Sequence, residues 1–535
     1  MLMPRGRMLA AALCLVLAGK VAAQAMAAGT LAERVRAELT SKFEATRGAR
    51  KLLPFVYAAR DFQPLWVDPA RVAQLRHTIA NIAAEGLQPE DYFADALRVA
   101  WATAAVDLQQ AVTRELLASE ALLRLVTHLR FGKVDPAAID RGWDLSRRVP
   151  DEEIIALFNA AAHAADLPAF LAALAPTHSS YARLREALAA YRDRAAGGGW
   201  PLGIAEGETL REGMRDARVT ALRARLASDD PTLATSVDPE SFDAALTIAV
   251  REFQRRQGLA VDGAVGKGTR AALNVPITAR IDQIRVNLER ARWVLHNLTE
   301  EYLAVNIAGF EAYLLRRGDL VWRSKVIVGR TYRRTPVFRA AMQYLVLNPT
   351  WTVPPTILRN DVLPKLRKDP AYLDQQRFDV LDGKGNRIDP AAIDWSTLSA
   401  RSFPYLLRQR AGADNALGKI KFMLPNEYDV YLHDTPQRQL FARAERTFSS
   451  GCIRVEHALE LAELLLDDQQ QWNRAAIEAA IATGATRTVV LPKPLEVLLL
   501  YWTAMVDSDG TVRHYPDVYQ RDAPLLAALN RPEPE

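Results

Sequence analysis

The chain has 535 residues, of which 49% are hydrophobic and 24% are charged. This length predicts about three domains, and the composition is typical of a folded globular protein. The formal net charge is +5, and loss of three positive charges with an N-terminal signal (Arg5, Arg7 and Lys20) would leave +2. A charge so close to zero argues against nucleic-acid binding. The sequence has no zinc-binding His-Glu-x-x-His pair, calcium loop or phosphate-binding glycine loop, so we expect no metal and no cofactor.

Residues 1–27 have the three parts of a secretory signal peptide. A basic start with Arg5 and Arg7 precedes the apolar run Met8 to Ala18, and small residues suited to cleavage follow. The apolar run is too short to cross a membrane as a helix, which takes roughly 20 residues. We therefore expect a protein exported to the periplasm, with no integral membrane span after cleavage. An uncleaved N-terminal anchor is the alternative.

Residues 30–200 are rich in alanine and leucine at helical spacing, which predicts a helical scaffold domain. The sequence AAGGGWP then marks a break, because consecutive glycines followed by Trp-Pro are typical of a linker or turn. Residues 207–275 predict a compact unit of short helices. Residues 276–300 predict a connecting helix with Arg285 and Arg290 on its polar side.

From residue 301 to 510 the apolar period changes from 3.6 to 2, and turn sequences such as Arg-Gly-Asp separate the apolar runs. This pattern predicts a β-rich domain, with strands that include 420–423, 488–491 and 497–504. A more polar stretch at about 354–414 interrupts it, and we expect this stretch to be an inserted helical lid. Residues 511–535 are predicted to be a C-terminal tail. The predicted fold class is therefore α+β multidomain.

The chain contains two cysteines, Cys14 and Cys452, and the first lies in the predicted signal peptide. The mature protein would keep one thiol, which cannot form an internal disulfide and is open to oxidation in an oxidising compartment. Such a cysteine is either a small buried apolar residue or a reactive group. The preceding Ser-Ser-Gly favours a tight turn in which a backbone amide can approach a ligand, and hence a reactive Cys452.

Cysteine catalysis needs an imidazole that generates the thiolate and carries protons. His433 ends a predicted strand and precedes Cys452 by 19 residues. We expect a helix at 455–465 to begin just after Cys452, where its N-terminus would lower the pKa of the thiol. The backbone amides at Gly451 and Cys452 are candidate oxyanion donors. His457 is a rival base, although its place on the predicted helix points it elsewhere.

The stretch AVREFQRRQGLAVDGAVGKGTRAAL resembles the small three-helix peptidoglycan-binding domain. The matching positions include a Phe-Gln pair, a Gly-Leu pair and an Asp-Gly pair. The resemblance covers about sixty residues and implies a module that binds the cell wall. A generic helical bundle whose glycines end its helices is the alternative.

The stretches YLHDTP and FSSGCIRVEHALELAELLL resemble the catalytic signature of L,D-transpeptidases with a YkuD-type domain. NPTWTVPPTILRNDVLPKLRKDP and NALGKIKFMLPN resemble the larger, YcbB-like branch of that family. The resemblance implies Cys452 as the nucleophile, His433 as the proton donor and acceptor, and Arg454 as a residue that orders the loop or meets a substrate carboxylate. Many members have a histidine directly before Gly451, where this chain has Ser450, and the YcbB-like branch tolerates the serine.

The resemblance also implies a reaction on peptidoglycan stem peptides, within cell-wall biogenesis and the maintenance of cell shape. Cys452 would form a thioester with a tetrapeptide donor stem and expel its terminal D-Ala, and the amine of a second stem would close a 3→3 cross-link. Water as acceptor would make the enzyme an L,D-carboxypeptidase, and a protein could be attached or released instead. Trp351, Tyr431 and Ser450 are expected at the substrate groove, although the two aromatics fit equally well in the core. Peptidoglycan synthases or D,D-carboxypeptidases are candidate partners, and a wall-binding scaffold without chemistry is the non-enzymatic alternative.

Overall fold

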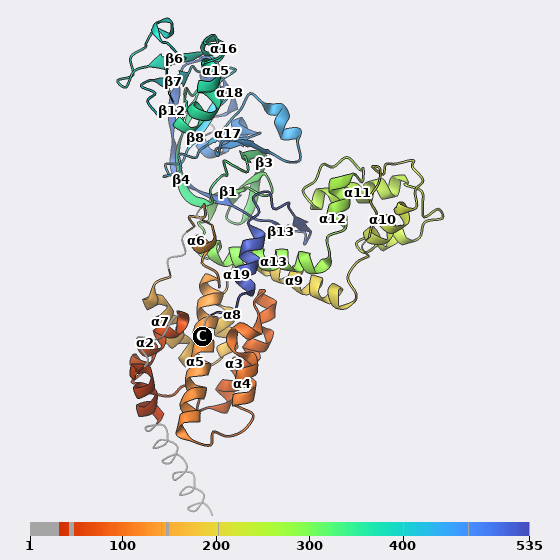
Figure 1. Cartoon of the computed structure of the whole chain (residues 1–535), viewed down its shortest axis with the longest axis vertical. Coiled ribbons are helices and arrows are strands. Elements are labelled where there is room, and N and C mark those ends of the chain that lie inside the picture. Colours follow the sequence, from red (N-terminus) through yellow and green to blue (C-terminus); the bar gives the residue numbers. More distant parts are fainter. Residues whose placement is uncertain are drawn as a thin grey trace, which may run out of the picture.

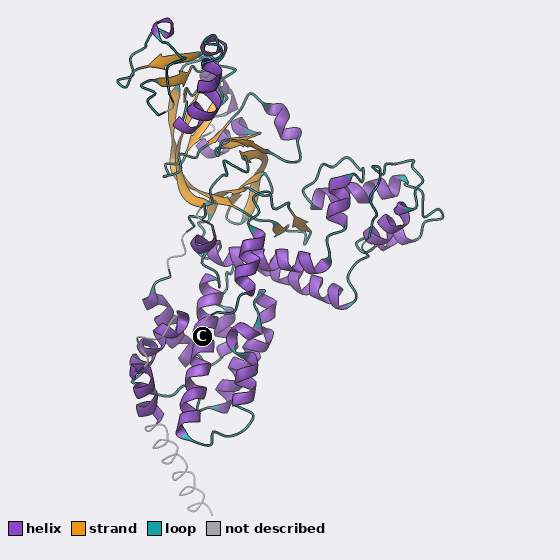
Figure 2. Ribbon diagram, in the orientation of Figure 1, coloured by secondary structure: helices purple, strands orange, loops and turns teal. Residues whose placement is uncertain are grey.

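The computed structural model describes residues 31–41, 48–140, 142–145, 149–201, 203–399, 401–468 and 470–533. The predicted signal peptide lies outside these ranges. Within them, none of the helices combines the length and the apolar character that crossing a membrane requires. Helices make up the lower part of the molecule, and the strands gather at the opposite end (Figure 2).

The N-terminal part is a helical domain with its own apolar core. Its longest helix, α5, begins where Asp107 accepts a hydrogen bond from the Gln110 N–H at 2.7 Å, and it ends at Gly132 with a φ of +85°. Most of its side chains are buried, because the other helices surround it (Figure 1). Residues 31–41 are helical, and the helices that follow in this part are η2 (Gly48–Leu52), α2 (Leu53–Ala58), α3 (Pro69–Asn81), η3 (Ile82–Glu85), η4 (Pro89–Tyr92), α4 (Ala94–Ala100), α5 (Leu108–Phe131), α6 (Pro136–Ile139), α7 (Asp151–His163), α8 (Leu167–Ala172) and α9 (Ser179–Ala196).

A small helical module projects to one side of the chain (Figure 1). It has a separate apolar core and contains α10 (Arg218–Ala227), η5 (Pro231–Ala234), α11 (Ala244–Arg256) and α12 (Lys267–Leu273). The Gln254 side chain is 1% exposed and joins three segments of the module. Its Nε2 donates to Asp262 Oδ1 (2.8 Å), the Ala264 carbonyl (2.9 Å) and Thr269 Oγ1 (3.1 Å), and its Oε1 accepts from the Gly263 N–H (2.9 Å). The quoted motif residues therefore hold the module together.

The connecting helix α13 (Ile277–Val294) packs against α9 and α19 between the helical domain and the sheet. The prediction that Arg285 and Arg290 lie on a polar side was wrong, because both are buried. Arg290 pairs with Asp522 at 2.6 Å, and Arg292 pairs with Glu289 at 2.7 Å on the same helix. A buried guanidinium is tolerated only when it is paired and hydrogen-bonded. The periodicity alone could not supply these partners, which are distant in sequence or on the helix itself.

A nine-stranded sheet dominates the C-terminal part, with the strand order β10-β3-β11-β9-β8-β4-β12-β1-β2. Because β2 also pairs with β3, the sheet closes on itself. The two predicted strands near 488–491 and 497–504 form one long strand, β12, with an irregularity between Val490 and Leu495. The strands are β1 (Glu301–Asn306), β2 (Glu311–Arg316), β3 (Asp319–Gly329), β4 (Phe338–Leu347), β8 (Ile420–Met423), β9 (Leu432–His433), β10 (Thr447–Ser449), β11 (Ile453–Val455) and β12 (Arg487–Leu500), with η8 (Arg438–Ala442), α17 (Ala458–Leu466) and α18 (Arg474–Ala482).

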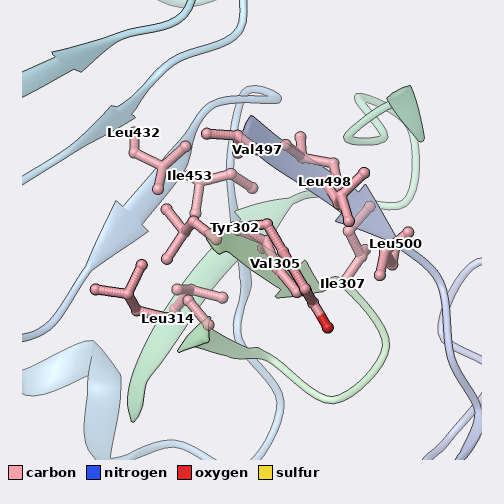
Figure 3. Packing of buried hydrophobic residues seen from close by; sticks show 14 of the residues in the cluster. Tyr302, Val305, Ile307, Leu314, Leu432, Ile453, Val497, Leu498 and Leu500 are labelled. Atoms are coloured by element: carbon pink, nitrogen blue, oxygen red, sulfur yellow. The ribbon is translucent and has the colours of Figure 1, made fainter. Parts of the chain in front are cut away.

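The apolar core of the sheet includes Leu432 of β9 and Ile453 of β11, which face Val497 and other core residues (Figure 3). Successive side chains of a strand point to opposite faces. The residues next to these two core residues therefore lie on the other face of the sheet. That face carries the residues of the candidate site.

The insertion between β4 and β8 forms a subdomain with its own small core. It was expected to be helical, but it also contains the three-stranded sheet β5-β7-β6. Strands of two to four residues leave too short a pattern to be recognised in sequence. The subdomain contains β5 (Trp351–Thr352), α14 (Pro355–Ile357), the π-turn η6 (Leu358–Val362), α15 (Leu363–Leu366), α16 (Tyr372–Gln375), β6 (Phe378–Leu381), η7 (Pro390–Ala392) and β7 (Leu406–Gln409).

The predicted C-terminal tail is not a loose extension. A hairpin of β13 (Ala504–Val506) and β14 (Val512–His514) leads to α19 (Asp522–Asn530). Leu525 and Leu529 of α19 enter the core of the N-terminal helical domain. The last helix thus returns to the first domain and packs against α13.

Candidate active site

Three neighbouring strands place three basic side chains in one row. Lys421 of β8 pairs with His433 of β9, and His433 pairs with Arg454 of β11. Directly paired residues share one face of a sheet. This is the face opposite to Leu432 and Ile453, so the row lies outside the apolar core.

Tyr431 and Cys452 extend this arrangement by one step. The Ile453 N–H donates to the Tyr431 carbonyl at 3.0 Å, so Cys452 lies beside Tyr431 in the parallel pairing of β11 with β9. His433 is two residues beyond Tyr431 and shares its face. Spacings of about 4.8 Å between strands and about 6.6 Å along two residues bring the Cβ atoms of Cys452 and His433 within about 8 Å. Side chains of these lengths can bridge that separation.

His433 is buried, and its ring is held by the next residue. The Nδ1–H donates to the Asp434 carbonyl at 2.5 Å, because a carbonyl oxygen can only accept. This bond leaves Nε2 as the nitrogen that can take up a proton. Burial and the positive charges of Arg454 and Lys421 together lower the pKa of His433 to about 3. The imidazole is therefore neutral at pH 7, as a general base must be.

The turn after His433 is itself fixed. The Asp434 carboxylate accepts from the Lys419 N–H at 2.9 Å and from Arg438 at 2.7 Å. Gly418 has a φ of +61°, and a Cβ at this position would collide with the Asp434 carboxylate. Gly418 thus allows Asp434 to approach the backbone closely, and the residues that follow it form the strand that carries Lys421.

Cys452 is half-buried, and its Sγ lies 3.8 Å from the Asp429 carbonyl. Burial raises the pKa of the thiol, while hydrogen bonds from Tyr431 and the charges of Lys421 and Arg454 oppose that rise. The expectation that a helix N-terminus lowers this pKa was wrong. Cys452 is followed by strand β11, and α17 begins only at Ala458. The helix predicted at 455–465 was placed to begin too early, because Val455 is the last residue of β11 (Ile453–Val455).

Tyr431 connects the thiol to the inserted subdomain. Burial raises the pKa of Tyr431 above its usual range, the charge of Cys452 and a hydrogen bond with it add to the rise, and a hydrogen bond from Trp351 opposes it. Lys421 Nζ lies 3.9 Å from the centre of the Tyr431 ring. Of the predicted groove residues, Tyr431 therefore lies beside Cys452, and Trp351 contacts Tyr431.

The loop before Cys452 is fixed by its own hydroxyl groups. Gly451 has a φ of +124°, a region that favours glycine. Its N–H donates to Ser449 Oγ at 3.1 Å, and Ser449 Oγ donates to the Cys452 carbonyl at 2.6 Å. The Gly451 amide is therefore engaged, and oxyanion donation by it stays a prediction that requires this bond to break. Ser450 is exposed, and its Oγ accepts from Arg333 at 2.9 Å.

A cavity of about 220 Å³ lies between the inserted subdomain and the residues that follow His433. Trp351, Asp361 and Phe378 line it from the subdomain, and Gln437 and Arg454 line it from the sheet. The Arg454 Nη1 donates to Gln437 Oε1 at 2.7 Å, whereas its buried Nε makes no hydrogen bond within the part of the chain that is described. A positive, incompletely hydrogen-bonded guanidinium at a cavity suits a carboxylate ligand.

The rival base His457 does not join this group. It caps α17 and is exposed, with its Nε2 3.7 Å from Glu456. Lys421, Arg333 and Asp361 were not among the site residues predicted from the sequence. Only Lys421 left a signal, because it is a charged residue between two apolar ones on a predicted strand.

The geometry of this site agrees with the comparisons with known proteins. Residues 300–490 match the family model of the L,D-transpeptidase catalytic domain. This segment belongs to the L,D-transpeptidase catalytic-domain family. Residues 215–273 match a peptidoglycan-binding domain, and residues 51–188 match a scaffold domain. The matches confirm the resemblance drawn from the sequence and the predicted fold class, whereas the domain boundaries given there stay predictions.

The chain is similar to curated proteins over parts of their length. It is 38% identical, over 46% of this chain and 50% of the other, to a Haemophilus influenzae protein whose name assigns it provisionally to the L,D-transpeptidases. It is 45% identical to the N-acetylmuramoyl-L-alanine amidase CwlM of Mycobacterium tuberculosis, over 13% of this chain and 19% of the other. The chain thus spans half, or less, of the length of these two relatives.

A solved L,D-transpeptidase structure from Stackebrandtia nassauensis aligns with 54% of this chain and 94% of its own. The sequence identity is 11% and the TM-score is 0.22. A likeness at this level adds nothing to the assignment, which rests on the family models.

Proposed function

We propose that this chain is a periplasmic L,D-transpeptidase that forms 3→3 cross-links in peptidoglycan through a thioester on Cys452. The observation that carries the proposal is the position of the thiol. It lies beside the Tyr431 hydroxyl and on the same sheet face as the oriented His433 and as Arg454, which lines a cavity under the inserted subdomain. Nucleophile, base and binding space are the three parts that acyl transfer needs.

The first step is acylation by the donor stem. Cys452 Sγ attacks the carbonyl carbon of stem residue three while His433 Nε2 takes up the thiol proton. The tetrahedral intermediate collapses, the bond to the terminal D-Ala breaks, and the D-Ala amine leaves with the proton from His433. The Tyr431 hydroxyl is near enough to the thiol to stabilise charge that develops there.

The second step transfers the acyl group to an acceptor. The side-chain amine of another stem attacks the thioester carbonyl, passes a proton to His433, and forms the new amide bond. The thiolate then recovers that proton from His433. Attack by water would give a tripeptide instead, so exclusion of water from the cavity decides between cross-linking and hydrolysis.

The resting pair of Cys452 and His433 is neutral. Burial raises the pKa of the thiol, and the pKa of His433 is lowered to about 3. A stored thiolate–imidazolium pair is therefore not favoured, and the proton moves as the substrate carbonyl is attacked. Lys421 and Arg454 supply positive charge that favours the thiolate as it forms.

Arg454 and the helical module are proposed to bind the substrate. The Arg454 guanidinium faces the cavity and would pair with a carboxylate of the stem peptide. The module matched as a peptidoglycan-binding domain would keep the enzyme at the wall and raise the local concentration of stems. Export to the periplasm through the predicted signal peptide, and pairing with synthases or D,D-carboxypeptidases that make suitable donors, belong to the same proposal.

The test is incubation of the purified protein with tetrapeptide muropeptides, followed by chromatography and mass spectrometry of the products. We expect free D-Ala and dimers joined between the third residues of two stems. Tripeptides without dimers would show that water is the acceptor, and the enzyme would then be an L,D-carboxypeptidase. Absence of both products would contradict the proposed enzyme and leave the wall-binding scaffold.

A further inference from the structure

Arg333 joins the inserted subdomain to the loop that carries the nucleophile. It follows β3 in the segment 330–335, and its Nη1 contacts two groups. One is the Asp361 carboxylate, in the π-turn η6 of the inserted subdomain, at 2.5 Å. The other is the Ser450 hydroxyl, two residues before Cys452, at 2.9 Å. A single guanidinium thus bridges parts of the chain that are about ninety residues apart.

The segment around Arg333 is firmly bonded to the nucleophile loop. Thr335 Oγ1 donates to the Gly451 carbonyl at 2.8 Å and accepts from the Gly329 N–H at 2.9 Å. The Arg330 N–H donates to the Ser449 carbonyl at 3.0 Å. Arg333 therefore projects from a rigid base, and movement of its side chain is transmitted to the loop through Ser450.

The environment of the bridge makes it stronger than an ordinary surface ion pair. The Arg333 side chain is 11% exposed and that of Asp361 is 37% exposed. Exposed pairs contribute little because water screens them, whereas loss of one partner from a partly buried pair leaves a charge uncompensated. Asp361 also lines the cavity beside Arg454. The bridge thus forms part of the wall that a bound substrate would contact.

We infer that Arg333 is a positioning residue that couples closure of the inserted subdomain to placement of Cys452. When Asp361 is within reach, Arg333 contacts both the inserted subdomain, through Asp361, and the loop that carries Cys452, through Ser450. When the subdomain moves away, Arg333 loses Asp361 and is free to leave Ser450, which removes one of the contacts that position the loop. This inference rests on the proposed function, and it adds a reason why acylation should proceed only in the covered cavity.

The kinetic test uses Arg333→Ala, Asp361→Asn and the double variant. We expect each to lower kcat for D-Ala release about tenfold with KM changed less than threefold, and the double variant to lose no more than the singles, because all three remove one bridge. Arg333→Lys should keep part of the rate, because lysine keeps the positive charge but places its ammonium differently from the Nη1 that contacts both partners. Additive losses, or unchanged kcat in Arg333→Ala, would overturn the inference.

Arg334→Ala is the matched control. Arg334 is the next residue, is exposed, and bonds to the Thr331 carbonyl and stacks on Tyr519 rather than reaching the subdomain. Its rate should stay within twofold of the unchanged protein. Hydrogen exchange gives a readout that does not depend on catalysis, and residues 355–366 and 447–452 should both exchange faster in Arg333→Ala. Exchange that rises in only one segment, or in neither, would refute the coupling.

These outcomes separate the two proposals. If the unchanged protein releases no D-Ala, the proposed function fails, and the exchange data alone judge the bridge. If it does release D-Ala and Arg333→Ala matches it, the function stands and the inference about Arg333 fails.

Discussion

The peptidoglycan-binding module and the catalytic sheet use their motif residues in opposite ways. In the module, the Gln254 side chain is almost fully buried and joins its own helix α11 to two other segments of the fold. In the sheet, Cys452 is half-buried and Arg454 keeps a buried Nε that makes no hydrogen bond among the described residues. The polar groups of the module motif are hydrogen-bonded within the module. The motif of the sheet leaves Arg454 with hydrogen-bonding capacity at a cavity.

The contrast separates residues that specify a fold from residues that carry chemistry. Satisfied buried groups stabilise a structure, because an unsatisfied one would cost free energy. Groups whose pKa values are perturbed by burial and by specific charges are typical of functional sites. His433 and Cys452 meet this description, and Gln254 does not. Substitutions in the two regions should therefore differ in whether they change catalysis or stability.

Cys452→Ala should give the largest loss of catalysis. Without the thiol no thioester forms, so D-Ala release should fall more than a thousandfold, to the level of the blank. The melting temperature should change by only a few degrees, because the thiol makes no strong contact in the fold. The assay is D-Ala release from a tetrapeptide donor, with circular dichroism as the check on folding. Residual release above one per cent would contradict the role of Cys452.

His433→Gln should follow, with a loss of roughly 10²–10⁴ in kcat, the usual contribution of a positioned general base. Glutamine keeps the size and a donor for the Asp434 carbonyl but cannot accept the thiol proton. Steady-state kinetics measure the loss. His457→Gln is the control, because that histidine is exposed at the start of α17 and should stay within twofold. Equal losses in the two variants would remove His433 from the mechanism.

Lys421→Met should lower the rate about tenfold, because loss of this positive charge raises the pKa of the Cys452 thiol further. The Lys421 charge opposes the rise that burial causes, and methionine keeps the length of the side chain without it. Alkylation of the thiol as a function of pH measures the shift. Lys419→Met removes an exposed lysine two residues away and should leave the titration unchanged. A titration that is the same in both variants would exclude the electrostatic role of Lys421.

Gln254→Ala should leave soluble-donor catalysis unchanged and destabilise the module by about 2–3 kcal/mol, because it leaves buried groups without partners. Ile248→Ala on the same helix is the control, since that side chain is 68% exposed. Hydrogen exchange across residues 244–273 measures the local effect. A stability loss in Gln254→Ala no larger than in Ile248→Ala would break the contrast between the two motifs.

Acidification from pH 7.5 to 5 should give the smallest effect, less than twofold in kcat/KM for the donor. The active form needs a neutral His433, and its pKa of about 3 lies well below this range. Protonation would therefore suppress the rate only as the pH falls towards 3. The raised pKa of the thiol keeps the neutral pair dominant on the alkaline side. A fall in kcat/KM with its midpoint near pH 6.5 would show that the pKa of His433 is that of an ordinary histidine, and it would contradict this prediction.

Several features of the fold and the site could be predicted from the sequence. The apolar periodicity located the helical domain, and the alternation near 301 and 420 located strands, because burial on one face leaves a regular pattern. Cys452 and His433 were recognisable from the residues around them. The short strand Ile453–Val455 was not, since three residues between a turn and a helix carry no period of their own.

The other corrections have a different physical cause. The buried arginines of α13 looked polar because their partners, such as Asp522, lie far away in the sequence. The bridge from Arg333 to Asp361 and Ser450 could not be predicted for the same reason, because its partners are also distant in the sequence. From the sequence alone a charged residue is predicted to be exposed, because the partner that allows it to be buried is brought close only by the fold. Long-range pairing is therefore the part of this site that only the structure supplies.

The most direct test is the mass of the enzyme during turnover. The protein is mixed with a tetrapeptide donor, quenched in acid within the first turnover, and mapped as peptides. The account predicts a tripeptidyl thioester on the peptide that contains Cys452, together with one equivalent of D-Ala, and neither in Cys452→Ala. An acyl group on another residue, or D-Ala release without any acyl-enzyme, would contradict it.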